Sequence, residues 1–270
     1  MTAQAYLHGY TQKERARLYH QAQFLQEAVY EHVDLSRARN LVEVGCGVGA
    51  QTKILLQRFP QLSIDAVDIS ESQLKQAKLH LSSEVKRKQV KFYQSAAERL
   101  PFKDNTYDAA FVCWFLEHVE DPVKILREIR RVMSTSAVIY CSEVLNSTYY
   151  VHPYSPAILQ YWFEFNDQQW TLKGDPFVGA KLANCLIEAG FQNVSIEVRN
   201  HHYDNRFPKK RAQGIDDMSA FLLSAAPQLL ASKRVTPKLV QQMGQEIEKL
   251  KKDPDSVLYW SWFQAKAYAL

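Results

Sequence analysis

Hydrophobic positions along this chain follow two periods, and the change from one period to the other marks the expected elements. Short runs rich in β-branched and aromatic residues, bounded by Gly, Pro, Asn, Asp or Ser, predict buried strands. The expected strands cover residues 40–45, 63–69, 89–95, 107–114, 136–144, 193–201 and 257–268. Amphipathic helical patterns separate most of them. This alternation predicts an α/β fold, with a doubly wound parallel sheet and helices on both faces.

Three segments lie outside this alternation. Residues 1–35 are expected to form a helical cap, because their apolar positions recur near the helical spacing. Residues 146–180 are dense in aromatic residues, and residues 202–256 contain two further helical patterns that are expected to form a helical flank. Ligands of a doubly wound sheet bind beyond the carboxyl ends of its strands. The first two segments are placed to cover that edge, so they are the expected substrate lid.

Residues 41–52, LVEVGCGVGAQT, form the most informative motif of the chain. An apolar strand runs into Gly45, Gly47 and Gly49 and then into a helix-like run. Glycine lets the backbone turn tightly and approach a ligand, and the amides of the first helical turn then point at that ligand. The motif predicts an enzyme that binds a nucleotide or nucleoside cofactor. It also fits the dinucleotide pattern G-x-G-x-x-G/A, with Asp68 as the ribose acid.

The rest of the core favours a different cofactor. Glu43 precedes the glycines, and residues 95–122 read SAAERLPFKDNTYDAAFVCWFLEHVEDP. Together with ILREIRRVM and AVIYCSEVL, these motifs resemble class I S-adenosylmethionine-dependent methyltransferases over residues 36–145. The core is UbiE-like, and the flanks resemble a bacterial and archaeal group that acts on small molecules. The resemblance implies a Rossmann-like sheet of seven strands with the last strand antiparallel, and a methyltransferase domain over residues 36–270.

The resemblance also implies which residues hold S-adenosylmethionine. Asp68 is expected to accept hydrogen bonds from the ribose hydroxyls, since Ser70 is the better cap for the next helix. Glu43 has two open roles, which are fixing the loop and contacting the methionine ammonium. Many relatives carry Asp where this chain has Ala96. The expected cofactor residues are Glu43, Gly45, Cys46, Gly47, Gly49, Asp68, Ile69, Gln73, Ala96, Ala97, Cys113, Trp114 and Tyr10.

Three residues are candidates for a catalytic base. Transfer of a methyl group is an in-line displacement, so a base is needed only when the acceptor must lose a proton. Glu143 follows the fifth strand and His152 lies in the expected lid, so both are expected to face the substrate. His118 has a suitable pKa range. It ranks below the other two, because the same histidine is common in relatives with unrelated substrates and so is expected to hold its loop.

Aromatic residues gather in the expected lid. Two interpretations of this run stay open: a helix packed on both sides, and a pocket for a planar or apolar acceptor. Tyr6 and Tyr10 are expected to close the site from above. The aromatic run comprises Tyr161, Trp162, Phe163, Phe165 and Trp170.

Composition agrees with a cytoplasmic enzyme. The chain has 270 residues, of which 46% are hydrophobic and 23% charged, and no run approaches the ~20 apolar residues of a membrane span. Its four cysteines are scattered, which predicts reduced thiols and no structural metal. The basic clusters at 209–211 and 249–252 are expected to be solvated rather than to bind nucleic acid. An NAD-linked oxidoreductase and a non-catalytic S-adenosylmethionine-binding protein are the alternative functions.

Overall fold

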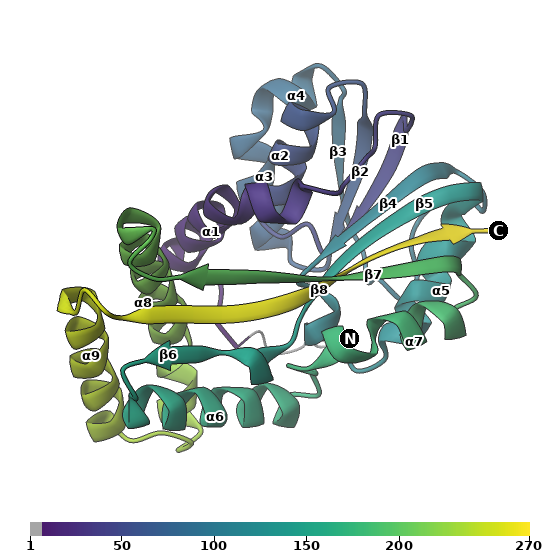
Figure 1. Ribbon diagram of the computed structural model, residues 1–270. Helices are drawn as coiled ribbons and strands as arrows, with labels where there is room; N and C mark the ends of the chain where they lie inside the picture. Colours follow the sequence, from purple (N-terminus) through teal and green to yellow (C-terminus); the bar gives the residue numbers. More distant parts are fainter. Residues whose placement is uncertain (1–6) are drawn as a thin grey trace.

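Eight strands form one sheet in the order β3-β2-β1-β4-β5-β8-β6, with β7 paired to β8 (Figure 1). The computed structural model describes residues 7–270. The strands are β1 (Asn40–Val44), β2 (Ser63–Asp68), β3 (Val90–Gln94), β4 (Tyr107–Cys113), β5 (Met133–Val144), β6 (Tyr150–His152), β7 (Gln192–Tyr203) and β8 (Val257–Ala269). Strands β1 to β5 pair in parallel, whereas β8 pairs antiparallel with β5, β6 and β7. The predicted Rossmann-like sheet with an antiparallel last strand is therefore confirmed.

The sheet contains one strand more than the sequence predicted. The short strand β6 pairs with the first residues of β8, Tyr150 facing Tyr259 and His152 facing Val257. It lies within the segment that was expected to form a lid. Strand β8 is long enough to pair with β5 through its second half and with β6 through its first residues.

Helices cover both faces of the sheet. The helices are α1 (Gln12–Tyr30), α2 (Ala50–Arg58), α3 (Glu71–His80), α4 (Ser82–Lys86), α5 (Pro122–Val132), α6 (Pro156–Thr171), α7 (Leu182–Glu188), α8 (Pro208–Ala231) and α9 (Pro237–Lys252). Short 3-10 turns are η1 (Leu116–His118), η2 (Asn146–Thr148) and η3 (Val178–Lys181). Alternate residues of β1 enter different cores: Leu41 packs in the cluster with α1, α2 and α3, and Val42 in the cluster with α5 and α7.

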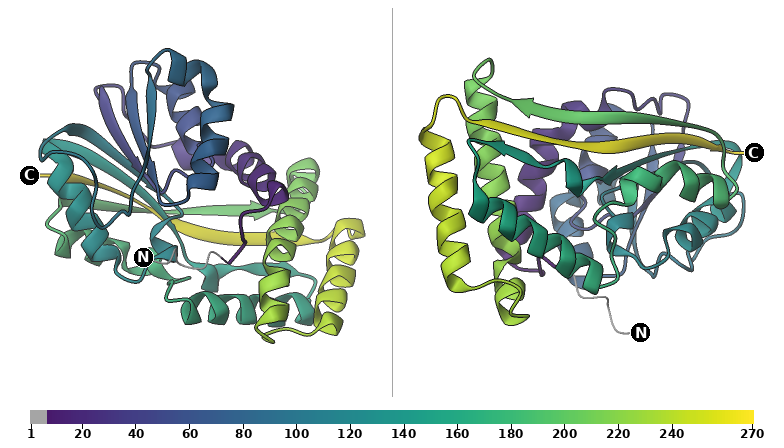
Figure 2. Two further views of the ribbon diagram at one scale, coloured as in Figure 1. Left: turned by 180° about the vertical axis from the view of Figure 1, so that it is seen from behind. Right: turned by 60° about the horizontal axis from the view of Figure 1, so that its bottom comes forward.

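A third apolar core lies at the other end of the molecule. Helices α6, α8 and α9 gather there around β6 and the first part of β8 (Figure 1). Seen from behind, α1 crosses between the helices beside β1–β3 and helix α8 (Figure 2). Helix α1 contacts α2 and α8, so it connects the two ends of the molecule.

Helix α8 begins earlier than the sequence predicted. Its first turn carries the basic run at 209–211, which was expected to be solvated. Lys210 fits that expectation, since it is exposed and forms an ion pair with Glu27. Arg211 does not: it is buried, and its guanidinium donates a hydrogen bond to the carbonyl of Pro254. That bond fastens the start of α8 to the chain before β8.

Two searches of the described residues gave negative results. No helix within residues 7–270 is long and apolar enough to cross a membrane. Over the same residues, no three His, Cys, Asp or Glu side chains gather closely enough to hold a metal ion.

Candidate active site

A cavity of about 380 Å³ lies beyond the carboxyl ends of β1, β2 and β4. Val44, Asp68 and Cys113 end these strands and line it. From there the cavity reaches α1, α8 and β8. Small-molecule sites have volumes of this order and mostly apolar walls with a few polar groups. The cavity therefore lies where a doubly wound sheet is expected to bind its ligand.

The glycine loop forms one wall of this cavity. Gly45, Gly47 and Gly49 have φ angles of +77°, +51° and +75°, which side chains other than glycine rarely adopt. A Cβ atom at Gly45 would lie 2.4 Å from the ring of Phe115, and one at Gly49 would lie 2.7 Å from Leu81. At Gly47 no atom lies within 4 Å of that position. The loop is packed closely at two glycines and leaves open space at Gly47, where a ligand can approach the backbone.

Asp68 lies next to this open position. Its Oδ2 accepts a hydrogen bond from the N–H of Gly47 and its Oδ1 one from the N–H of Ser70, both 2.8 Å long. Burial raises the pKa of Asp68, and the two N–H groups oppose that rise. Tyr10 lines the same cavity, and the pKa of its hydroxyl is raised by burial and by the charge of Asp68. Asp68 retains lone pairs that can accept ribose hydroxyls.

Three further predicted residues line the cavity beside Asp68: Ile69, Gln73 and Ala97. Ile69 is 46% exposed, which leaves an apolar surface free to contact a ring. Gln73 is buried, and among the described residues its Oε1 has no hydrogen-bond partner. A buried polar atom without a partner costs about 1–3 kcal/mol. Gln73 therefore contributes a buried amide to this wall, while Ile69 supplies its exposed apolar surface.

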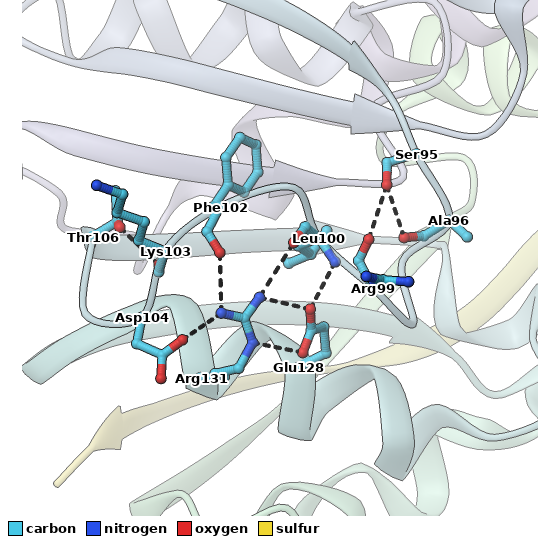
Figure 3. Close-up of polar contacts among 10 residues, drawn as sticks. All are labelled: Ser95, Ala96, Arg99, Leu100, Phe102, Lys103, Asp104, Thr106, Glu128 and Arg131. Atoms are coloured by element: carbon cyan, nitrogen blue, oxygen red, sulfur yellow. Dashed lines mark hydrogen bonds and ion pairs between the residues drawn. The ribbon is translucent and has the colours of Figure 1, made fainter.

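The segment after β3 is held by a network of hydrogen bonds (Figure 3). The hydroxyl of Ser95 donates to the carbonyl of Arg99 at 2.9 Å, which closes the turn around Ala97. The N–H of Leu100 donates to Glu128 of α5 at 2.7 Å. The guanidinium of Arg131 then contacts the carbonyls of Leu100 and Phe102 and the carboxylates of Asp104 and Glu128. Helix α5 therefore fixes the backbone that places Ala97 in the cavity wall.

Three predicted cofactor residues do not line the cavity: Glu43, Gly49 and Ala96. Glu43 is buried, and its Oε2 accepts a hydrogen bond of 2.6 Å from the hydroxyl of Thr52. Desolvation raises the pKa of Glu43 to about 8. Of its two open roles, the geometry agrees with a structural one, since the carboxyl ties β1 to α2. Gly49 precedes α2 as its N-cap.

The end of β4 forms the next part of the wall. Cys113 and Trp114 both line the cavity. Trp114 has a φ of +51°, and its N–H donates to the carbonyl of Ser142 at 2.8 Å. Strained backbone of this kind is concentrated at functional sites. Burial raises the pKa of the Cys113 and Cys46 thiols well above the usual value, so neither is a reactive thiolate at neutral pH.

Glu143 does not face the substrate, contrary to the expectation from its position after β5. It is fully buried and does not line the cavity. Its carboxylate accepts hydrogen bonds from the N–H groups of Phe115, Leu116 and Glu117, at 3.0, 2.7 and 3.3 Å. Glu143 therefore holds the η1 turn, and its buried carboxyl does not lie where the sequence placed it, on the side of the cavity.

Of the two histidine candidates, His118 lines the cavity and His152 does not, the reverse of the expected order. His152 lies on β6 with an exposed side chain outside the cavity lining, which does not agree with the expected contact with substrate. His118 lines the cavity, and its Nε2 lies 3.7 Å from Oε1 of Glu117. The other oxygen of Glu117 accepts a hydrogen bond of 2.8 Å from Gln169. Glu117 is thus fixed by α6, and its carboxylate lies near the ring of His118.

The family of the chain follows from its core. Residues 42–141 match the model of a methyltransferase domain family. Residues 42–141 therefore form a methyltransferase domain, and this domain contains the glycine loop, Asp68 and β4. The cofactor of such a domain is S-adenosylmethionine.

Individual relatives of the methyltransferase are distant. The chain is 27% identical over 119 residues to methyltransferase GfsG of Streptomyces halstedii. This alignment covers 44% of the chain and 42% of GfsG. The chain is 26% identical over 196 residues to a demethylmenaquinone methyltransferase of Lactococcus lactis, which covers 64% and 77% of the two chains. The structure of phosphoethanolamine N-methyltransferase 2 from Haemonchus contortus, solved with S-adenosylhomocysteine, has a TM-score of 0.59 at 13% identity and covers 98% and 60%. The methyltransferase thus spans less than half the length of GfsG.

The aromatic run of the expected lid is divided between two environments in the methyltransferase. Trp162 lines the cavity, with Tyr149 at a centroid distance of 4.8 Å. Tyr161 and Phe165 are buried in the core of α6, α8 and α9. The remaining two residues of the run, Phe163 and Trp170, are exposed. Trp162 also belongs to this core, so three residues of the run are packed in it and one of the three reaches the cavity.

The sequence analysis missed the wall that α8 contributes. Met218 and Phe221 line the cavity together with Asp217, and β8 adds Trp260 and Trp262. The apolar spacing in α8 predicts a buried helix face but does not reveal what that face covers. The contribution of β8 follows from its length beyond β5, which becomes visible only when the register is known.

Proposed function

We propose that this methyltransferase transfers the methyl group of S-adenosylmethionine to a small-molecule acceptor. The observation that supports this is the extent of the cavity, which continues from the glycine loop to an apolar wall on α1, α8 and β8. One end carries the open position at Gly47 and the carboxylate of Asp68. The other end is lined by side chains of α1, α8 and β8. A single cavity with these two ends can hold donor and acceptor side by side.

The residues of the chain would divide the work of binding. Asp68 would accept the ribose hydroxyls, Ile69 would contact the base, and the N–H groups of the glycine loop would lie along the methionine end. S-adenosylmethionine supplies an electrophilic methyl group on a sulfonium. Alignment of the acceptor with that methyl group accounts for much of the rate of such displacements. Trp114 and Trp262, whose rings lie 6.3 Å apart, would exclude water from the path between them.

His118 is the residue we propose as the base where the acceptor must lose a proton. It lines the cavity, and the carboxylate of Glu117 lies near its ring. A histidine beside a carboxylate is a common arrangement for proton transfer at neutral pH. Glu143, which sits behind this turn, would act only by holding it.

The walls support an apolar or planar acceptor. Phe24, Met218, Phe221 and Trp260 line the cavity away from the glycine loop. The Lactococcus lactis relative carries demethylmenaquinone in its name, and a molecule of such apolar chemistry agrees with these walls. We further propose that α1 and the segment 146–180 form the lid over the cavity, with the helices of 202–256 as its flank. Tyr6, expected to help close the site, lies outside the described residues.

A direct test combines methyl transfer with binding. The purified protein is incubated with S-adenosylmethionine labelled at its methyl group and with sets of quinone, phenol and amine acceptors, and labelled products are identified by mass spectrometry. Transfer to at least one acceptor is expected. Detection of stoichiometric binding of S-adenosylhomocysteine with no transfer to any acceptor would support a non-catalytic binding protein instead.

Asp68→Ala tests the cofactor site. The variant should bind S-adenosylhomocysteine about 1.5–3 kcal/mol more weakly, the range for hydrogen bonds to a charged group. Isothermal titration calorimetry measures the difference. Glu71→Gln is the matched control, because Glu71 is exposed on the following helix and pairs only with Lys75 among its ion-pair contacts. Equal affinity in Asp68→Ala and the control would remove Asp68 from the site.

A further inference from the structure

Helix α6 buries a row of polar groups along one of its faces. Trp162, Asn166 and Gln169 recur at the spacing of a single helix face, and the two amide side chains are only 6% and 3% exposed. Burial of an amide costs free energy unless hydrogen bonds offset it. Each of the three side chains forms a hydrogen bond with one of two cavity-lining residues, Asn146 or Glu117.

Asn146 follows β5 and is fixed by contacts from two segments. Its backbone N–H donates to the carbonyl of Pro176 at 3.0 Å, and its carbonyl accepts from the indole of Trp162 at 2.8 Å. Its side-chain Nδ2 donates to Oδ1 of Asn166 at 2.9 Å. Both the backbone and the side-chain amide of Asn146 are therefore held in one orientation.

The amide oxygen of Asn146 remains available in this arrangement. No group within residues 7–270 donates a hydrogen bond to Oδ1, and this oxygen is not one of the inaccessible side-chain atoms that lack a partner. It therefore keeps accessible surface on a residue that lines the cavity. An amide oxygen whose side chain is already ordered can accept an O–H or N–H of a ligand with little further loss of entropy.

Asn146 lies on the same side of the cavity as the base proposed above. The carbonyl of Glu117, the residue before His118, accepts a hydrogen bond from the N–H of Asp175 at 2.8 Å. Asn146 is bonded to the next residue of that segment, Pro176. Two adjacent residues of one segment thus hold the η1 turn and the end of β5 together, and both His118 and Asn146 line the cavity there.

We infer that Asn146 Oδ1 accepts a hydrogen bond from a neutral O–H or N–H group of the acceptor and thereby places the acceptor beside His118. The amide is uncharged, so it distinguishes a hydrogen-bond donor from an apolar group of similar size. This inference rests on the proposed function, because it assigns this side of the cavity to the acceptor. Asn146 is a binding residue in this assignment and takes no part in the transfer of the methyl group.

Two matched pairs of probes test the inference without knowledge of the natural acceptor. 2-Naphthol and 2-methylnaphthalene differ in a hydroxyl against a methyl group, and indole and benzothiophene differ in an N–H against a sulfur. Equilibrium dialysis measures the binding of each probe to protein saturated with S-adenosylhomocysteine, so that the cofactor end is occupied.

Three substitutions by leucine are compared with the wild type. Asn146→Leu removes the amide oxygen from the cavity wall. Asn166→Leu breaks the same hydrogen bond from the side of α6 but leaves Oδ1 of Asn146 in place, and Asn166 itself does not line the cavity. Gln160→Leu is the matched control, because Gln160 is an exposed amide of α6 outside the cavity lining.

In at least one pair, Asn146→Leu should lower the ratio of the affinity for the donor probe to that for the apolar probe by about 3–10-fold, the contribution of one hydrogen bond between neutral groups. Asn166→Leu should lower this ratio less, and Gln160→Leu should leave it unchanged. Asn146→Asp retains an acceptor oxygen and should therefore keep the preference for the donor probe. Circular dichroism and the affinity for S-adenosylhomocysteine report whether each variant is folded.

An unchanged ratio for both pairs in a folded Asn146→Leu would overturn the inference. Equal losses in Asn146→Leu and Asn166→Leu would also overturn it, because Asn146 would then act only as a tie between β5 and α6. The same holds if none of the four probes binds to the wild type loaded with S-adenosylhomocysteine. If Asn146→Leu does not fold, Asn146→Ala removes the amide without added bulk and is judged by the same ratio. Failure of the wild type to bind S-adenosylhomocysteine would instead refute the proposed function.

Discussion

Asp68 and Glu143 both stand at the ends of parallel strands, yet only one of them reaches the cavity. Asp68 has lone pairs that remain available beside Gly47. The carboxylate of Glu143, in contrast, accepts hydrogen bonds from three backbone N–H groups at the η1 turn. The sequence shows an acid near the end of a strand in each case. It does not show that the chain folds back over one of them, because that depends on the path of residues 115–117. The position of Asp68 at the cavity was therefore open to prediction from the sequence, and the position of Glu143 was not.

His118→Asn is predicted to slow methyl transfer by roughly 10²–10⁴-fold for an acceptor that must lose a proton. The reason is that His118 is the only one of the three base candidates that lines the cavity. Affinity for S-adenosylhomocysteine should stay at the wild-type value. Single-turnover rates with a labelled methyl donor give the comparison.

The control for this prediction is His152→Asn, a histidine that is exposed on β6. It should retain the wild-type rate. A slow His152→Asn beside an active His118→Asn would restore the ranking that the sequence alone suggested.

At the scale of elements, strongly patterned segments were predictable and short ones were not. The strands of the parallel core are continuous apolar runs, and the glycine loop marks the crossing from β1 to α2, so all of them could be recognised in the sequence. Strand β6 has three residues, Tyr150–His152, and exists because the first residues of β8 offer a free edge. The early start of α8 likewise depends on a tertiary contact, the bond from Arg211 to Pro254.

Two buried glutamates, Glu143 and Glu43, make the stability of the protein depend on pH. Desolvation, aided by Glu117, raises the pKa of Glu143 to about 8 from the ordinary value of 4.5, and burial does the same to Glu43. Between pH 4.5 and about 8, these two glutamates are deprotonated in the unfolded chain but still protonated in the folded protein. The free energy of unfolding should therefore fall as the pH rises from about 5 to about 8, and level off above that.

Urea unfolding across this pH range measures the effect. Glu143→Gln removes one of the two titrating groups, so its stability should depend less steeply on pH than that of the wild type. Glu120→Gln, an exposed substitution whose residue pairs with Lys173, should keep the wild-type slope. A wild-type stability that rises through this range would contradict the sign.

At the scale of the whole molecule, the cavity lies between two parts that each have their own apolar core. One part is the parallel sheet with the glycine loop, and the other is the core of α6, α8 and α9. Helix α1 crosses between them and contributes to the cavity wall (Figure 2). The sequence predicted that a cap and a lid would cover the sheet edge. It did not predict the wall from α8, because the packing of α8 against α1 is a contact between distant segments.

Backbone exchange should report closure of this cavity. We predict that amide hydrogen exchange in α1 and in residues 146–180 slows when S-adenosylhomocysteine and an acceptor bind, since closure excludes water from the reaction. Mass spectrometry of peptides gives the rates. Helix α9 is an internal control, because no described residue of α9 lines the cavity. Equal rates in α1 with and without ligands would show that it is a fixed wall.

Strand β8 follows every strand with which it pairs, and this order has a consequence for synthesis of the protein. On the ribosome, the glycine loop and the parallel strands emerge before the strand that joins β5 to β7 and carries Trp260 and Trp262. Until then β5 and β7 expose long unpaired edges, which are prone to pair with other chains. A premature stop codon before β8 would therefore yield a chain for chaperones and proteases to remove, with the glycine loop but without the part of the cavity wall that Trp260 and Trp262 form.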